Sequence, residues 1–288
     1  MRPEFAFEIE NIFKSFESEI DILRQCPPSK HTDIPSRAIV ISAYAKAYDF
    51  VRYMCQMTDL KPSFFQLPML RGICEDLIAI SYLITQSKAK QNYLIVTKRH
   101  EELKLSTKAQ AGFFSKYNKG QIVAPPLNHG DIQIILDEYR RAGHDFENAK
   151  LPKVYTMAKR VGLKDLYSFI YHSTSKAVHF DIFTLLSMGW GKLDKKERTI
   201  EANYSHEHDY KHYYSFGVFY STYLFIYETI KFEPFLDLPP KIKKQLSTLE
   251  EVYKQIDWPE LVTFSQLNIK PPNTLTKAIF RVIKNEIP

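Results

Sequence analysis

The sequence predicts an all-α protein, a single helical-bundle-like domain over residues 1–288. Apolar residues recur at three- and four-residue spacing through most of the chain, which is the period of an amphipathic helix, and no convincing strand ladder interrupts them. The chain has only 9 glycines, too few for the turns of a nucleotide-binding α/β fold. Its 44% hydrophobic and 25% charged residues are typical of a globular protein with a real core.

The helices are bounded by proline, glycine and polar breaks. From the N-terminus we expect helices over 5–24, 36–57, 64–86, 89–104, 151–162 and 163–179, then over 207–231, 240–256 and 275–285. Pro152 suits a helix start and Gly162 a helix end. The stretch 115–151 is the least regular, so we interpret it as an excursion with one short helix, "DIQIILDEYRR". Residues 188–206 predict a loop or one small hairpin.

Composition also narrows the class of protein. The net charge of +6 is spread without a basic tail, so it permits a polyanionic partner without requiring one. Cys26, Cys55 and Cys74 lie far apart, which favours free thiols in a reducing cytosol. The N-terminus does not read as a signal peptide, and the apolar stretch 213–230 holds five tyrosines and Glu228. We therefore expect a cytoplasmic protein with no membrane contact.

One apolar segment, "LRGICEDLIAISYLI" at 70–84, carries three charges. At 100° per residue Arg71 and Glu75 share one stripe of this helix, whereas Asp76 falls well away from it. Residues four apart on a helix can form an ion pair, but a pair removed from water needs further hydrogen-bonding partners. The sequence therefore predicts that Arg71 and Glu75 meet polar groups from another helix.

A second polar stripe supplies those groups. In "LYSFIYHSTSKAVHF", polar side chains recur every four residues along an otherwise apolar face, at Tyr167, Tyr171, Ser175 and His179. We expect the two stripes to face each other across the bundle. The predicted cluster consists of Arg71, Glu75, Tyr171, Ser175 and His179.

This pattern resembles an uncharacterised bacterial family, a domain of unknown function. The R-x-x-x-E helix, the later Y-x-x-x-S-x-x-x-H helix and the preceding "MAKRVGLKDLY" match in order over about residues 36–185. The resemblance implies an all-helical core, on which we expect residues 207–288 to pack. A looser likeness is to HEPN-type helical bundles, which often act as metal-independent RNases. Their R-x(4-6)-H signature is missing, because "RRAGH" at 140–144 has the wrong spacing.

The predicted cluster suits two different functions. In an enzyme, His179 would be the general acid or base, Arg71 would clamp a phosphate, Glu75 would orient Arg71 or the imidazole, and Tyr171 and Ser175 would donate hydrogen bonds. That chemistry fits cleavage of RNA or of a nucleotide phosphodiester without a metal. A role of such an enzyme in phage defence or toxin biology is implied by the HEPN likeness alone. The alternative is a non-catalytic module that binds a partner protein, in which the cluster is structural. Both the enzyme and the interaction module are compatible with a homo-oligomer.

No cofactor is expected. The chain contains no P-loop, no dinucleotide-binding glycine pattern and no G-x-S-x-G elbow. In "SHEHDYKHYY", His208 and His212 have a spacing that can hold a metal, with His206 and Asp209 nearby. Histidines at the start of a helix are usually surface residues, so the sequence favours no metal unless this helix start lies close to His179.

Overall fold

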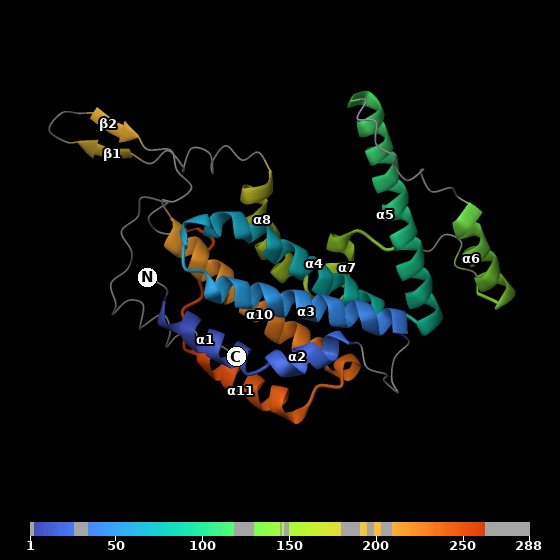
Figure 1. Cartoon of the computed structure of the whole chain (residues 1–288), viewed down its shortest axis with the longest axis horizontal. Helices are drawn as coiled ribbons and strands as arrows, with labels where there is room; N and C mark the ends of the chain where they lie inside the picture. Colours follow the sequence, from blue (N-terminus) through green and yellow to red (C-terminus); the bar gives the residue numbers. More distant parts are fainter. Residues whose placement is uncertain are drawn as a thin grey trace. The chain divides into compact units, whose positions relative to one another are not determined.

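The computed structural model describes residues 3–25, 34–117, 130–144, 146, 150–179, 191–194, 199–202 and 209–262 (Figure 1). The chain divides into a unit of Met1–Ile256, whose fold follows, and a second unit of Asp257–Pro288. The described secondary structure is helical apart from two short strands, so the all-α prediction is confirmed. The single-domain arrangement of the whole chain stays a prediction.

The N-terminal helix is broken where the sequence predicts a continuous one. Helix α1 covers Glu4–Lys14 and α2 covers Glu17–Arg24. Between them, the Ser15 hydroxyl donates a 2.6 Å hydrogen bond to the carbonyl oxygen of Ile12. Such a bond competes with the helical pattern. The break also lets Phe13 and Phe16 both reach the core, with ring centroids 5.5 Å apart.

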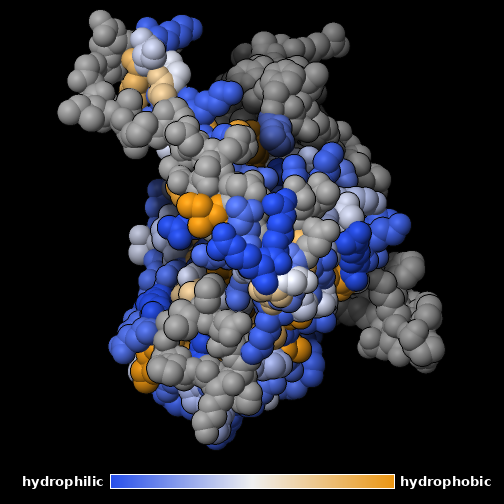
Figure 2. All heavy atoms as spheres, turned by 90° about the vertical axis from the view of Figure 1, so that its right-hand side faces the viewer, coloured by the Kyte–Doolittle hydropathy of each residue, from blue (hydrophilic) through white to orange (hydrophobic). Residues whose placement is uncertain are grey.

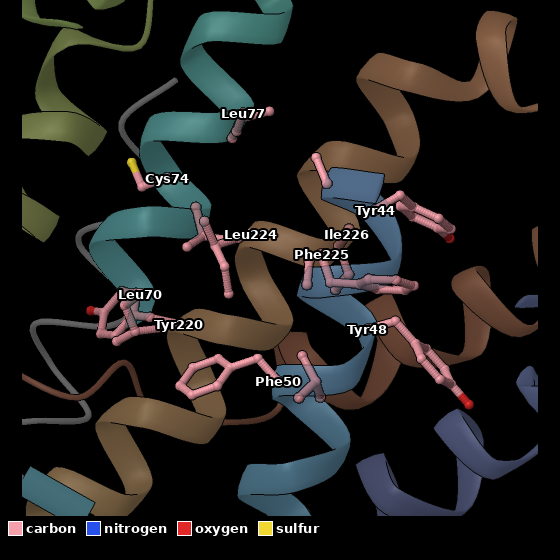
Figure 3. Close-up of a cluster of buried hydrophobic side chains, with 14 of the residues drawn as sticks. Tyr44, Tyr48, Phe50, Leu70, Cys74, Leu77, Tyr220, Leu224, Phe225 and Ile226 are labelled. Carbon is pink, nitrogen blue, oxygen red and sulfur yellow. The ribbon is translucent and has the colours of Figure 1, made fainter. Parts of the chain in front are cut away.

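Helices α3 (Ile34–Gln56), α4 (Leu67–Leu83) and α10 (Tyr210–Leu236) form the centre of the bundle (Figure 1). Helix α10 packs most extensively on α3 and also contacts α4 and the 3-10 turn η1 (Lys61–Gln66). On α10, Leu224 lies on the side of α4 and Phe225 on the side of Tyr44 and Tyr48 (Figure 3). The Phe225 ring centroid is 4.7 Å from that of Tyr44 and 4.8 Å from that of Phe13. Phe225 therefore joins three helices.

Two features of α10 depend on its neighbours. At Gly217 a Cβ atom would lie 2.5 Å from Cε of Met54, so glycine permits the close approach of α10 and α3. The helix also runs through Pro234 to Leu236, whereas the sequence predicts an end near 231. Phe232 and Leu236 are fully buried, and their burial keeps this last turn helical despite the proline.

Helix α5 (Lys88–Tyr117) runs 13 residues beyond the predicted end at 104, so the first part of the predicted excursion is helical. The C-terminal half of α5 is polar on most sides, so the amphipathic pattern from which a helix is predicted is weak there. The short helix predicted within the excursion is present as α6 (Gly130–Arg141), and Tyr139 packs on Tyr93 of α5. Residues 118–129, 145 and 147–149 of the excursion lie outside the described part of the chain.

The remaining elements follow the prediction closely. Helix α7 (Val154–Arg160) ends just before Gly162, whose φ of +75° suits glycine. Helix α8 (Lys164–Val178) follows, and strands β1 (Gly191–Asp194) and β2 (Thr199–Ala202) form the antiparallel hairpin. Helix α11 (Pro240–Lys254) packs on α1, and the helix predicted over 275–285 lies outside the described residues. None of the described helices is long and apolar enough to cross a bilayer.

Candidate functional site at the α4–α8 interface

Helix α4 has two differently occupied sides. Leu70 and Leu77 are fully buried in the core, and the buried Cys74 is a free thiol whose pKa burial raises to about 12 (Figure 3). Asp76 is on an exposed face, where it accepts a 2.6 Å hydrogen bond from Nζ of Lys46 on α3. The separation of Asp76 from the Arg71–Glu75 stripe agrees with the helical spacing.

Arg71 and Glu75 pair with each other at the boundary between core and solvent. Nε of Arg71 donates a 2.7 Å hydrogen bond to Oε1 of Glu75, and the two side chains are 26% and 30% exposed. This bond raises the pKa of Arg71 further above its usual range, against the opposing effect of partial burial. The pair is thus accessible from outside, in contrast to an ion pair sealed in the core.

Helix α8 contributes tyrosines to this pair. The guanidinium carbon of Arg71 lies 4.6 Å from the centroid of the Tyr171 ring, within the range of a cation–π contact. Burial raises the pKa of the Tyr167 hydroxyl, and the negative charge of Glu75 adds to this. Tyr167 therefore keeps its proton at neutral pH. The structure brings Arg71, Glu75 and Tyr171 together, with Tyr167 one turn away on the same face of α8.

The other end of the interface is held by a second arginine–tyrosine contact. Nη1 of Arg160 on α7 donates a 3.2 Å hydrogen bond to the hydroxyl of Tyr82, and its guanidinium lies 5.7 Å from that ring. Because Arg71 meets Tyr171 while Tyr82 meets Arg160, the α7–α8 segment runs antiparallel to α4. No spacing in the sequence identifies Arg160 as the partner of Tyr82.

Ser175 lies in the last turn of α8, and His179 is the residue that follows its last helical residue. The Ser175 hydroxyl oxygen is buried and has no hydrogen-bond partner among the described residues. His179 is exposed and caps the helix, with extended backbone (φ −112°, ψ 161°) and its N–H bonded to the carbonyl oxygen of Ser175 at 2.9 Å. Eight residues of helix separate Tyr171 from His179, about 12 Å along the axis.

The membership of His179 in one compact cluster with Arg71 and Glu75 therefore stays a prediction. The period of four residues assumed that α8 continues through His179, but the last helical residue is Val178. In an antiparallel pair, each step toward the C-terminus of α8 also moves away from Glu75 on α4. Two turns beyond Tyr171, His179 is thus displaced from Glu75 in the direction of the N-terminal end of α4.

A buried acid elsewhere in the bundle was recognised in the sequence only as a polar interruption. Glu228 of α10 is fully buried, and neither carboxylate oxygen has a hydrogen-bond partner in the described part of the chain. Burial raises the pKa of Glu228 well above its usual value, and nearby Asp76 adds to the effect while Lys46 opposes it. An acid in the middle of a stretch that is apolar all round is the sequence signal for such a group.

The histidines of the alternative metal site are only partly described. His206 and His208 lie outside the described residues. His212, in the first turn of α10, packs beside Tyr213 and Phe216, with ring centroids 5.8 and 6.1 Å away. Within the described ranges, no group of three or more His, Cys, Asp or Glu side chains is arranged to hold a metal ion.

Comparison with known proteins finds a family model, and its match covers the two helices of the α4–α8 interface. Residues 66–197 match the model of a family of unknown function, DUF5677. The matched stretch contains all of α4 and α8 and ends within the hairpin region, and it is somewhat less than half of the chain. The predicted resemblance to an uncharacterised family is confirmed, although the match begins at residue 66 and not near 36. The likeness to HEPN-type proteins gains no support from it.

No curated protein matches the chain, and no solved structure does.

Proposed function

We propose that the α4–α8 interface binds a phosphate group of RNA or of a nucleotide through Arg71. The observation that carries this proposal is the way the guanidinium is held. Nε is bonded to Glu75 and the guanidinium lies over the Tyr171 ring, so two contacts orient it. Its two terminal nitrogens donate no hydrogen bond to any described residue. An oriented fork with two free amino groups suits bidentate binding of a phosphate.

The neighbouring groups suit this role in different ways. The Tyr167 hydroxyl remains protonated and is a hydrogen-bond donor. Ser175, one turn beyond Tyr171, carries a hydroxyl without a protein partner among the described residues. Glu75 opposes an incoming anion by its charge, yet it orients the fork. The proposed site therefore combines positioning with partial charge neutralisation, which favours reversible binding of moderate affinity.

Binding fits the geometry better than cleavage. A general acid or base must come within hydrogen-bonding reach of the reacting atoms, directly or through one water. The axial distance of about 12 Å between Tyr171 and His179 exceeds that reach for a phosphate held at Arg71. The metal-free nuclease expected from the sequence thus becomes one outcome of the test, with His179 as its indicator.

The test is fluorescence anisotropy with a labelled single-stranded RNA, with ADP as competitor. Replacing Arg71 by Gln removes a charge-assisted hydrogen-bonding group worth about 1.5–3 kcal/mol, so we expect affinity to fall at least about tenfold. Glu75→Gln should strengthen binding, because it removes the opposing charge and keeps an acceptor for Nε. Arg160→Gln is the matched control, since it removes the other arginine–tyrosine contact of the same interface.

Equal affinities of the Arg71 and Arg160 variants would refute phosphate binding at this site. So would weaker binding by the Glu75 variant, because that result would mean the pair serves only to hold the helices. RNA cleavage by the wild-type chain that disappears in His179→Ala, at an unchanged thermal midpoint, would replace the binding proposal with the enzymatic one.

A second function, a protein-interaction module, is favoured by one observation. Phe65 at the end of η1 and Met69 in the first turn of α4 lie four residues apart and are 57% and 44% exposed. Neighbouring exposed apolar side chains are typical of interaction sites. Sedimentation velocity over a range of concentrations tests the simplest form, self-association. A Phe65→Ser, Met69→Ser variant should then stay monomeric where the wild type associates, and a wild-type monomer throughout would contradict self-association.

A further inference from the structure

A groove lies where α3, α4 and α5 meet the segment before α7. Its walls are apolar and come from four parts of the chain, with Ile39 on α3, Leu83 on α4, Ile95 on α5 and Leu151 before α7. Its volume is about 420 Å³. Small-molecule sites usually measure about 300–1,000 Å³ and have mostly apolar walls. The groove is thus of a size to hold one small ligand.

The apolar walls continue inward. Ile39, Leu83 and Ile95 also line a narrower slot that reaches Phe235 at the end of α10. The slot has a volume of about 10 Å³, close to that of one water-sized group. The side of the molecule facing the viewer in Figure 2 is mostly hydrophilic where it is described, and hydrophobic residues appear there as separate small patches. A wide apolar groove that narrows inward suits an unbranched aliphatic chain.

The rim of the groove carries an arginine that has no ion-pair partner in the described part of the chain. Nζ of Lys98 lies 3.1 Å from Oε1 of Glu102, so these two charges offset each other. Arg99 is exposed at the rim and forms no hydrogen bond or ion pair with the described residues. An anionic group on the ligand would therefore be favoured at this rim over a neutral or a cationic one.

We propose that this groove binds a small amphiphilic carboxylate. Its aliphatic chain lies against Ile39, Leu83 and Ile95, and its carboxylate lies at the rim and accepts hydrogen bonds from Arg99. The apolar walls come from α3, α4 and α5, and the charge of Arg99 comes from α5. The site is separate from Arg71, so the proposal stands or falls independently of phosphate binding at the α4–α8 interface.

The test is isothermal titration calorimetry of the full chain with sodium decanoate below its critical micelle concentration. We expect saturable binding of decanoate, weaker binding of decanol and none of decyltrimethylammonium. Arg99→Gln should weaken decanoate binding about three- to tenfold, as expected for one solvent-exposed charge-assisted contact, and leave decanol binding unchanged. Lys108→Gln is the matched control, because Lys108 is an exposed cation on the same helix outside the groove.

A second variant tests the apolar wall. Ile95→Trp should fill the groove and abolish binding of decanoate and decanol alike, and its circular dichroism and thermal midpoint report whether it folds. If it does not fold, Ile39→Trp fills the same groove from the α3 side. Undetectable binding of decanoate by the wild type would overturn the proposal. Equal affinity for decanoate and decanol, or an Arg99 variant no weaker than the Lys108 control, would overturn it as well.

Discussion

Replacement of Glu228 by Gln is expected to change how the stability of the bundle depends on pH. Glu228 is fully buried in α10, and neither oxygen of its carboxyl group has a partner among the described residues. The charged groups that act on it come from α4 and α3: Asp76 raises its pKa and Lys46 lowers it, both less than burial does. Gln has nearly the same shape as the neutral acid but does not titrate.

The size of the effect follows from proton linkage. The pKa of Glu228 is raised in the folded state, so the folded chain holds this proton more tightly than the unfolded chain. The resulting stability is fully present below the unfolded pKa, near 4.5, and is lost as pH rises toward the folded pKa. The slope in this window is about 1.4 kcal/mol per pH unit. As pH rises from 5 to 7, wild type should therefore lose stability relative to Glu228→Gln, at up to about 1.4 kcal/mol per pH unit until the folded pKa is reached.

Urea unfolding at pH 5, 6 and 7 measures this difference directly, and the thermal midpoints should diverge by roughly 2–4 °C for each kcal/mol of it. Because a buried amide has its own cost, the informative quantity is the change of the difference with pH and not its value at one pH. Glu233→Gln is the matched control, since Glu233 is an exposed acid on the same helix that pairs with Lys243. Parallel stability curves for wild type and Glu228→Gln would refute the reasoning.

Three further substitutions test the packing of the bundle. Phe225→Ala removes the ring that joins three helices and should lower the free energy of unfolding by about 3–5 kcal/mol in urea titrations. Asp237 ends α10 with a φ of +48°, and its Oδ2 lies 3.3 Å from Nη1 of the buried Arg37. Asp237→Leu should therefore lower the free energy of unfolding by about 1–3 kcal/mol, and Asp237→Asn should lower it clearly less. Equal losses would show that Arg37 does not need an acceptor there. Gly217→Ala should destabilise the wild type, because the added methyl group clashes with Met54. In a Met54→Ala background the same change should stabilise the protein by up to about 1 kcal/mol, because alanine favours the helix. A double-mutant cycle without this coupling would contradict the close contact.

The candidate site shows which inferences the sequence supports. The Arg71–Glu75 pair was predicted from a spacing of four residues, and the structure contains it, because helix geometry alone brings such side chains together. The contact between this pair and Tyr171 was also predicted from spacing, because both polar stripes interrupt apolar helix faces that must pack on each other. His179 was placed by extending the same period to the residue that caps α8, and its membership in the cluster stays a prediction. The partnership of Arg160 with Tyr82 joins residues 78 positions apart, and no local pattern indicates it.

By itself, the sequence determined the class of the fold, most of its helices and the turn at Gly162, because each depends on the spacing of residues within about one element. The tertiary structure decided where helices break or continue. The chain bends at Ser15 so that Phe13 and Phe16 both reach the core, and α10 passes Pro234 because Leu236 is buried. The burial of Glu228 was also decided there, because the solvation of a side chain depends on helices far away in the sequence that cover it.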